Sequence, residues 1–114
     1  MKAPQRRPLG SFVHARSGDK GGDANLGLWV GQGPKREERI AWLLEIATDD
    51  WVRDLIPEAT EVEVHPLPNL GGVNVVLRGL LGEGVAASTR FDPQAKGLGE
   101  WARSREVEIP EELV

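Results

Sequence analysis

The chain has 114 residues, a formal net charge of −4 and no cysteine. This length predicts a single domain, the acidic balance argues against a general nucleic-acid-binding role, and the lack of cysteine excludes disulfides and thiolate metal sites. The sequence has no apolar run of transmembrane length and no signal-peptide core, so we expect a cytoplasmic protein with no membrane contact.

The first two predicted strands flank a polar segment. Residues 12–15 and 25–30 have strand-like sequence, and Leu26, Leu28 and Val30 fall on one face at period two. The residues between the two strands are rich in glycine and in ionisable groups, unlike a simple turn. We therefore predict a loop of about eight residues that forms a site.

Two helices and a third strand follow along the chain. Residues 37–47 carry apolar side chains at helical spacing, which predicts a helix. Thr48 is suited to cap a second short helix, which ends at Pro57. Residues 61–65 alternate strictly between polar and apolar, which predicts a strand that Pro66 ends.

The C-terminal half contains one ambiguous segment. In residues 70–81 the valines favour a strand, but the apolar spacing fits a helical face better, and we predict a helix. We also predict a strand over residues 86–92 and a helix over residues 92–103. Residues 1–9 and 106–114 are expected to be tails of the domain, which spans the whole chain.

This order of elements predicts an α+β sandwich, in which helices cover one face of a mainly antiparallel sheet. A sheet with one open face leaves apolar surface or a strand edge exposed. We therefore expect a homo-oligomer, either a dimer or a larger assembly.

Three sequence blocks carry a family resemblance. Residues 16–27, 67–79 and 90–97 resemble, in the same order, the motifs of the small C-terminal domain of AtuA-type acyclic terpene utilisation proteins. The resemblance implies a ferredoxin-like fold, here without the family's larger N-terminal domain. It also implies a role in the degradation of acyclic isoprenoids or of related branched acyl-CoA compounds, and a separate large AtuA-like subunit as a candidate partner.

The polar segment supports three interpretations. Its cations and glycine amides suit a carboxylate or a phosphate. Its carboxylates and Asn25 suit Mg²⁺ or Ca²⁺, although we assign no metal ligand. In the simplest interpretation its opposite charges pair with one another, and the glycines only permit positive φ. The candidate ligand-binding residues, from this segment and from the second block, are Arg16, Ser17, Gly18, Asp19, Lys20, Gly21, Asp23, Asn25, Asn69, Asn74 and Arg78.

Three functions stay open at this point, with no cofactor specified. The first is a small auxiliary domain that binds an acidic or CoA-type metabolite at the Arg16–Asn25 segment. The second is an enzyme in which His14 or Asp19 is the general base and the cations fix the substrate. The third is a structural partner of a separate large AtuA-like subunit. No spacing in the sequence places a nucleophile beside a base, so we assign no catalytic residue.

Overall fold

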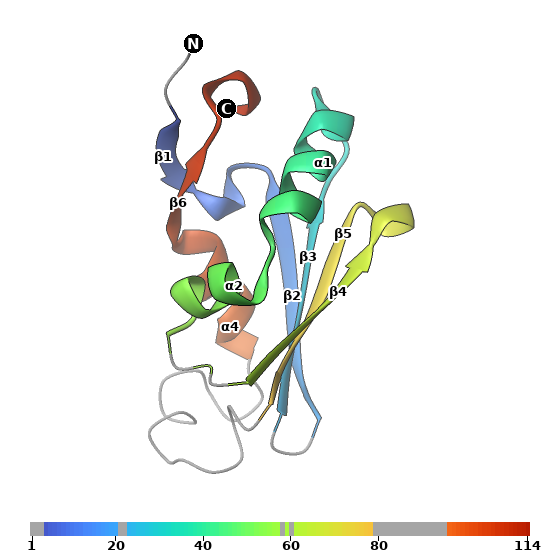
Figure 1. Cartoon of the computed structure of the whole chain (residues 1–114), viewed down its shortest axis with the longest axis vertical. Helices are drawn as coiled ribbons and strands as arrows, with labels where there is room; N and C mark the ends of the chain where they lie inside the picture. The colour runs from blue at the N-terminus through green and yellow to red at the C-terminus, as the bar shows by residue number, and fades with distance from the viewer. Residues whose placement is uncertain (1–3, 21–22, 58, 60, 79–95) are drawn as a thin grey trace.

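A four-stranded antiparallel sheet forms the centre of the molecule (Figure 1). The structure is a computed structural model, and it describes residues 4–20, 23–57, 59, 61–78 and 96–114. The strand order is β2-β3-β5-β4, and every neighbouring pair is antiparallel. The strands are β2 (Val13–Lys20), β3 (Asp23–Val30), β4 (Glu61–Leu67) and β5 (Gly72–Arg78).

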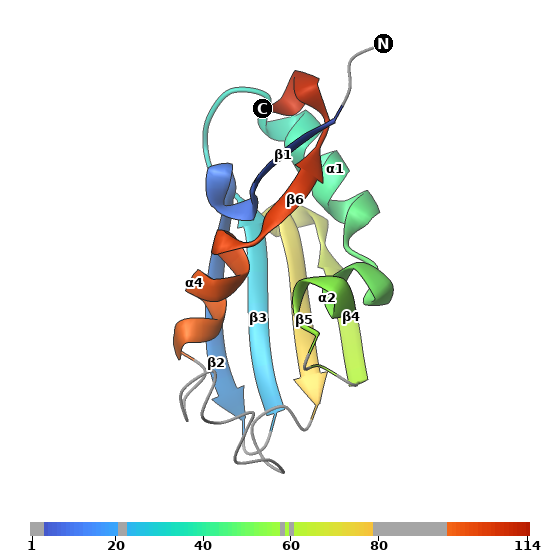
Figure 2. The same ribbon diagram turned by 90° about the vertical axis from the view of Figure 1, so that its left-hand side faces the viewer.

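The helices of the described residues lie over one face of this sheet, as Figures 1 and 2 show. They are α1 (Arg36–Ile46), α2 (Asp49–Leu55) and α4 (Lys96–Ser104). The core lies between these helices and the sheet. Leu26, Leu28 and Val75 from the sheet are fully or almost fully buried there, together with Leu43 of α1 and Leu98 of α4.

The other side of the sheet is called the open face below, because no helix of the described part of the chain lies over it (Figure 1). Side chains alternate between the two faces along each strand. In β3 every second residue from Ala24 to Val30 is buried under the helices, while Asn25, Gly27 and Trp29 face the open side. The fold is thus the predicted α+β sandwich with helices on one face.

The ends of the chain differ from the tails that we expected. β1 (Gln5–Pro8) pairs antiparallel with β6 (Glu106–Ile109) in a separate two-stranded sheet (Figure 2). Short 3-10 turns, η1 (Leu9–Ser11) and η3 (Glu111–Leu113), follow these strands. Apolar residues of both ends also pack into the core of the domain, namely Leu9, Val107, Ile109 and Leu113.

The predicted helix over residues 70–81 is wrong. A 3-10 turn, η2 (Pro68–Leu70), leads into β5, which pairs with both β3 and β4. Val73, Val75 and Leu77 are buried at period two, and β-branched side chains suit such a central strand. The apolar spacing that we assigned to a helix therefore belongs to a strand with one buried face. Residues 79–81 lie outside the described residues.

The other predicted elements are confirmed where the structure describes them. The helix over 37–47 is α1 and the helix after Thr48 is α2. The predicted strand at 61–65 is β4, which continues past Pro66 because an edge strand tolerates a proline. The helix at 92–103 corresponds to α4, with residues 92–95 outside the described part, and the predicted strand at 86–92 lies wholly outside it.

Thr48 gives a first testable prediction. Its Oγ1 accepts a hydrogen bond from the backbone N–H of Trp51 at 3.2 Å and so caps the first turn of α2. Thr48→Ala removes this acceptor, and we expect the free energy of unfolding to fall by about 1 kcal/mol. Urea denaturation measures the change. Thr48→Ser, which keeps the hydroxyl, should stay close to wild type, and equal losses in both variants would contradict the capping role.

Candidate functional site

The polar segment that we predicted as a loop is strand almost throughout. β2 continues to Lys20 and β3 begins at Asp23, so only residues 21–22, which lie outside the described part, connect them. The register pairs Gly18 with Asn25 and Lys20 with Asp23. Glycine and charged residues misled the prediction because β2 is an edge strand, where both are tolerated.

Strand alternation separates the candidate residues onto two faces. One row on the open face crosses all four strands, with Arg16 beside Gly27, Gly27 beside Asn74, and Asn74 beside His65. Ser17 lies on the helical side instead, where its Oγ accepts a hydrogen bond at 3.1 Å from the Gly99 N–H of α4. Ser17 therefore helps to hold α4 on the sheet.

An open groove of about 750 Å³ lies along the open face. Its polar side chains include Arg16, Asn25, Asn74 and His65, and its apolar side chains include Trp29, Leu67 and Leu70. The lining thus takes in the predicted residues Arg16, Gly18, Asn25 and Asn74, and also Ser17, although the Ser17 hydroxyl bonds to α4 on the helical side. Of the other predicted residues, Asp23, Asn69 and Arg78 are not part of the lining, Gly21 is outside the described residues, and the side chains of Asp19 and Lys20 are not described.

Two strand glycines leave space in this groove. A Cβ added at Gly18 would meet nothing within 4 Å, and one at Gly27 would meet only the Arg16 carbonyl oxygen, at 3.7 Å. Neither residue has a positive φ. Among the described residues, neither packing nor backbone conformation therefore requires a glycine at these positions. The missing side chains instead keep the groove open.

Gly72 is a glycine for a different reason. A Cβ there would collide with the Leu28 carbonyl oxygen and lie 2.6 Å from the Cα of Trp29. Both are backbone atoms of β3, so no side-chain rotation relieves the contact. Gly72 therefore allows β5 to approach β3 at the end of the groove where Trp29 lies.

Two side chains of β2 determine the chemistry of the rim of the groove. Arg16 is exposed, and within the described residues its guanidinium has no hydrogen bond or ion pair. The ring of His14, also exposed, stacks on Trp29 with 5.7 Å between ring centroids and 26° between planes. The rim thus offers one cation for an anionic ligand beside an aromatic wall.

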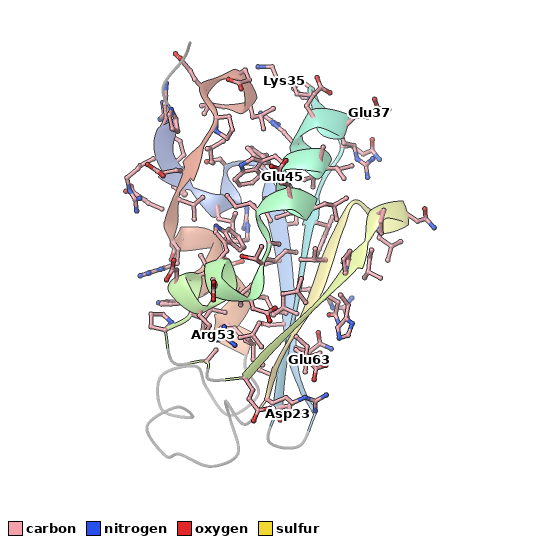
Figure 3. The ribbon with its side chains drawn as sticks, viewed as in Figure 1. Asp23, Lys35, Glu37, Glu45, Arg53 and Glu63 are labelled. Carbon is pink, nitrogen blue, oxygen red and sulfur yellow. The ribbon has the colours of Figure 1, made fainter. Side chains whose placement is uncertain are left out.

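An ion cluster lies at one end of the open face, where Figure 3 labels Asp23 and Glu63. Arg78 of β5 donates to Glu63 at 2.6 Å and approaches Asp23 at 3.5 Å, and His65 lies 3.3 Å from Glu63. The hydrogen bond from Arg78 lowers the pKa of Glu63 below its usual value, with a smaller contribution from His65. Asp23 thus pairs across strands with Arg78, a partner that the interpretation of pairing within the segment did not include.

A comparison with models of known protein families identifies the family of this chain. The model of the AtuA ferredoxin-like domain matches residues 7–108. The chain belongs to this family. The match confirms both the resemblance and the ferredoxin-like α+β fold. Searches of curated proteins and of solved structures gave no match.

Sequence reasoning missed part of the groove in this AtuA ferredoxin-like domain. Trp29 was not among the candidate residues, although its alternation with Leu28 and Val30 would have placed it on the open face. His65 and Leu67 come to the groove only through the pairing of β4 with β5, and Leu70 through the turn between them. We did not predict that pairing, because we predicted a helix over residues 70–81.

Two further findings concern other classes of function. Among the described residues, no group of three or more histidine, aspartate or glutamate side chains is placed to hold a metal ion. None of the described helices of the AtuA ferredoxin-like domain is long and apolar enough to span a membrane.

The ion cluster yields a second prediction. Because the folded-state pKa of Glu63 lies below its usual value of 4.5, its carboxylate stabilises the fold above that pH. This contribution is lost as the pH falls through the lowered pKa. Arg78→Gln removes the main cause, so we expect the pKa of Glu63 to rise in an NMR titration of its carboxyl carbon. Arg53→Gln on α2, where Arg53 pairs with Asp50, is the control. An unchanged Glu63 pKa in Arg78→Gln would contradict the assignment.

Proposed function

We propose that this AtuA ferredoxin-like domain binds a small organic acid in the groove of the open face. The observation that carries the proposal is the space above Gly18 and Gly27. A glycine inside a strand costs conformational entropy and side-chain packing, and it often marks a place where a ligand approaches the backbone. At both positions a side chain would fill the groove, so the glycines are best explained by an occupant.

The chemistry of the lining supports an acid as that occupant. The Arg16 guanidinium can form charge-assisted hydrogen bonds with a carboxylate, which are shorter and stronger than neutral ones. The amides of Asn25 and Asn74 can donate to the same group, and Trp29 supplies apolar contact. The groove volume lies within the range of about 300 to 1,000 Å³ that is usual for small-molecule sites.

The family resemblance narrows the candidate acids. It points to acyclic isoprenoid or branched acyl compounds, which combine an acidic group with an apolar chain. The enzyme alternative, with His14 or Asp19 as base, has less support. The His14 ring stacks on Trp29, and the side chain of Asp19 is not described.

Calorimetric titration with octanoate, a simple acid with an apolar chain, tests the proposal. We expect saturable binding with one molecule per chain. Arg16→Gln should weaken it about tenfold or more, because a hydrogen bond to a charged group contributes about 1.5–3 kcal/mol. The matched control is Arg53→Gln, an exposed arginine on α2. Absence of binding to the wild type, or equal losses in the two variants, would overturn the proposal.

Self-association through the open face is a second candidate function. Leu67 and Leu70, which are 38% and 66% exposed, lie together at one end of the groove. We propose that, in the absence of a ligand, a second copy of the chain covers them, since apolar surface grouped in this way favours association. A separate large AtuA-like subunit on this face is the alternative partner.

Light scattering at micromolar concentration tests for the second copy. The wild type should have the mass of a dimer or of a larger assembly. The variant with both Leu67→Ser and Leu70→Ser should be a monomer. A monomeric wild type, or a variant that associates as the wild type does, would count against this surface.

A further inference from the structure

We infer that the ligand is a monocarboxylate with an apolar chain, bound with the carboxylate at Arg16 and the chain directed toward Leu70. The inference rests on the proposed function and names the class of acid more narrowly. Three properties of the groove carry it: the order of its polar and apolar side chains, its charge, and the exposure of its apolar end.

Polar and apolar side chains are segregated along the groove. Three rows of residues follow one another along the groove. The first contains Asn25 and Gly18, and the second contains Arg16 and Asn74. The third contains Trp29 and Leu67. The first and last of these rows are four residues apart along the strands, or about 14 Å at about 3.4 Å per residue. Leu70 lies beyond the last row, in η2. A ligand with one polar end and one apolar end matches this order.

The charge of the open face favours a single negative charge on the ligand. Among the described residues that line the groove, Arg16 is the one arginine or lysine. The guanidinium of Arg78 in the neighbouring ion cluster already pairs with Asp23 and Glu63. Arg16 can neutralise a monocarboxylate, whereas a phosphate dianion or the several phosphates of coenzyme A would keep negative charge that Arg16 does not balance.

The apolar end of the groove can bury the hydrocarbon chain of a ligand. Leu70 has two thirds of its surface exposed, at 66%, and Leu67 and Trp29 lie alongside it in the lining. Burying a methylene group contributes about 0.8 kcal/mol, which corresponds to about a fourfold gain in affinity. The affinity of the groove should therefore rise with the length of the ligand chain until the chain passes Leu70.

The test compares butyrate, hexanoate, octanoate, octyl phosphate and coenzyme A by calorimetry. It uses the wild type and Leu70→Ser, at concentrations where light scattering gives the two proteins the same mass. In the wild type we expect affinity to rise from butyrate to octanoate by about fourfold or less per methylene. Octyl phosphate and coenzyme A should bind at least about tenfold more weakly than octanoate. Leu70→Ser should flatten the dependence on chain length, so that the affinity for octanoate falls by a larger factor than the affinity for butyrate.

The outcomes separate this inference from the proposed function. If octyl phosphate or coenzyme A binds as tightly as octanoate with a dependence on Arg16, the groove binds anions but the ligand class is wrong. If chain length has no effect in the wild type, the apolar end plays no part and the inference also fails. If none of the five compounds binds, the proposed function fails with it.

Discussion

Gly72→Ala is expected to prevent stable folding of this domain. The added methyl group would collide with the Leu28 carbonyl oxygen and lie 2.6 Å from the Cα of Trp29, both in the backbone of β3. Because Gly72 pairs with Trp29 in a central strand, β5 must move away from β3 to admit the methyl group. Overpacking that shifts a backbone typically costs 1–3 kcal/mol and sometimes more. We expect a loss of about 3 kcal/mol or more in urea denaturation, or no folded protein.

Gly27→Ala is the matched control for this prediction. Its methyl group would lie 3.7 Å from the nearest atom, the Arg16 carbonyl oxygen, which is an ordinary contact. The change should leave stability within about 1 kcal/mol of the wild type, since alanine also lowers the entropy of the unfolded chain. If Gly72→Ala unfolds at the same urea concentration as Gly27→Ala, β5 does not approach β3 at Gly72 as closely as the structure shows.

Gly27→Val is expected to weaken ligand binding by about tenfold or more while the domain stays folded. A β-branched residue suits a strand, and in the space above Gly27 the nearest described atom to an added Cβ is 3.7 Å away. That same space is the middle of the groove, between Arg16 and Asn74. A valine there displaces the ligand, and we expect the Kd for octanoate to rise by about tenfold or more.

A bulkier residue elsewhere on the open face provides the control. Val76→Ile adds one methylene group on the open side of β5, at a residue that is not part of the groove lining. It should bind octanoate as the wild type does. Calorimetry measures both variants, and circular dichroism checks their fold. Unchanged binding in Gly27→Val would remove the argument from the strand glycines.

The sequence predicted most local elements of this domain correctly, because their signals are local. The alternation of Leu26, Leu28 and Val30, the helical spacing after residue 36 and the cap at Thr48 are each contained within a few residues. The segment after Leu70 was wrong because Val73 and Leu77 are four apart, a spacing compatible with one face of a helix and with one face of a strand. Only the pairing of β5 with two neighbours resolves the ambiguity.

The candidate site was partly predictable for a related reason. Arg16, Gly18, Asn25 and Asn74 were chosen for their chemistry, and all four line the groove although we predicted a loop and a helix. The residues that were missed depend on non-local pairing. Trp29, His65 and Leu67 join Arg16 only when β4, β5, β3 and β2 lie in register, and nothing local in the sequence specifies that register. The pairing of β1 with β6 at the ends of the chain was missed for the same reason.

One measurement tests the central claim, that the groove of the open face binds an organic acid, most directly. Amide NMR spectra recorded during a titration with octanoate report where the ligand lies on the folded domain. We predict saturable shifts at Arg16, Gly27 and Asn74 and at the indole N–H of Trp29, with no shift on α2. Shifts confined to the helical side, or none at all, would contradict the claim.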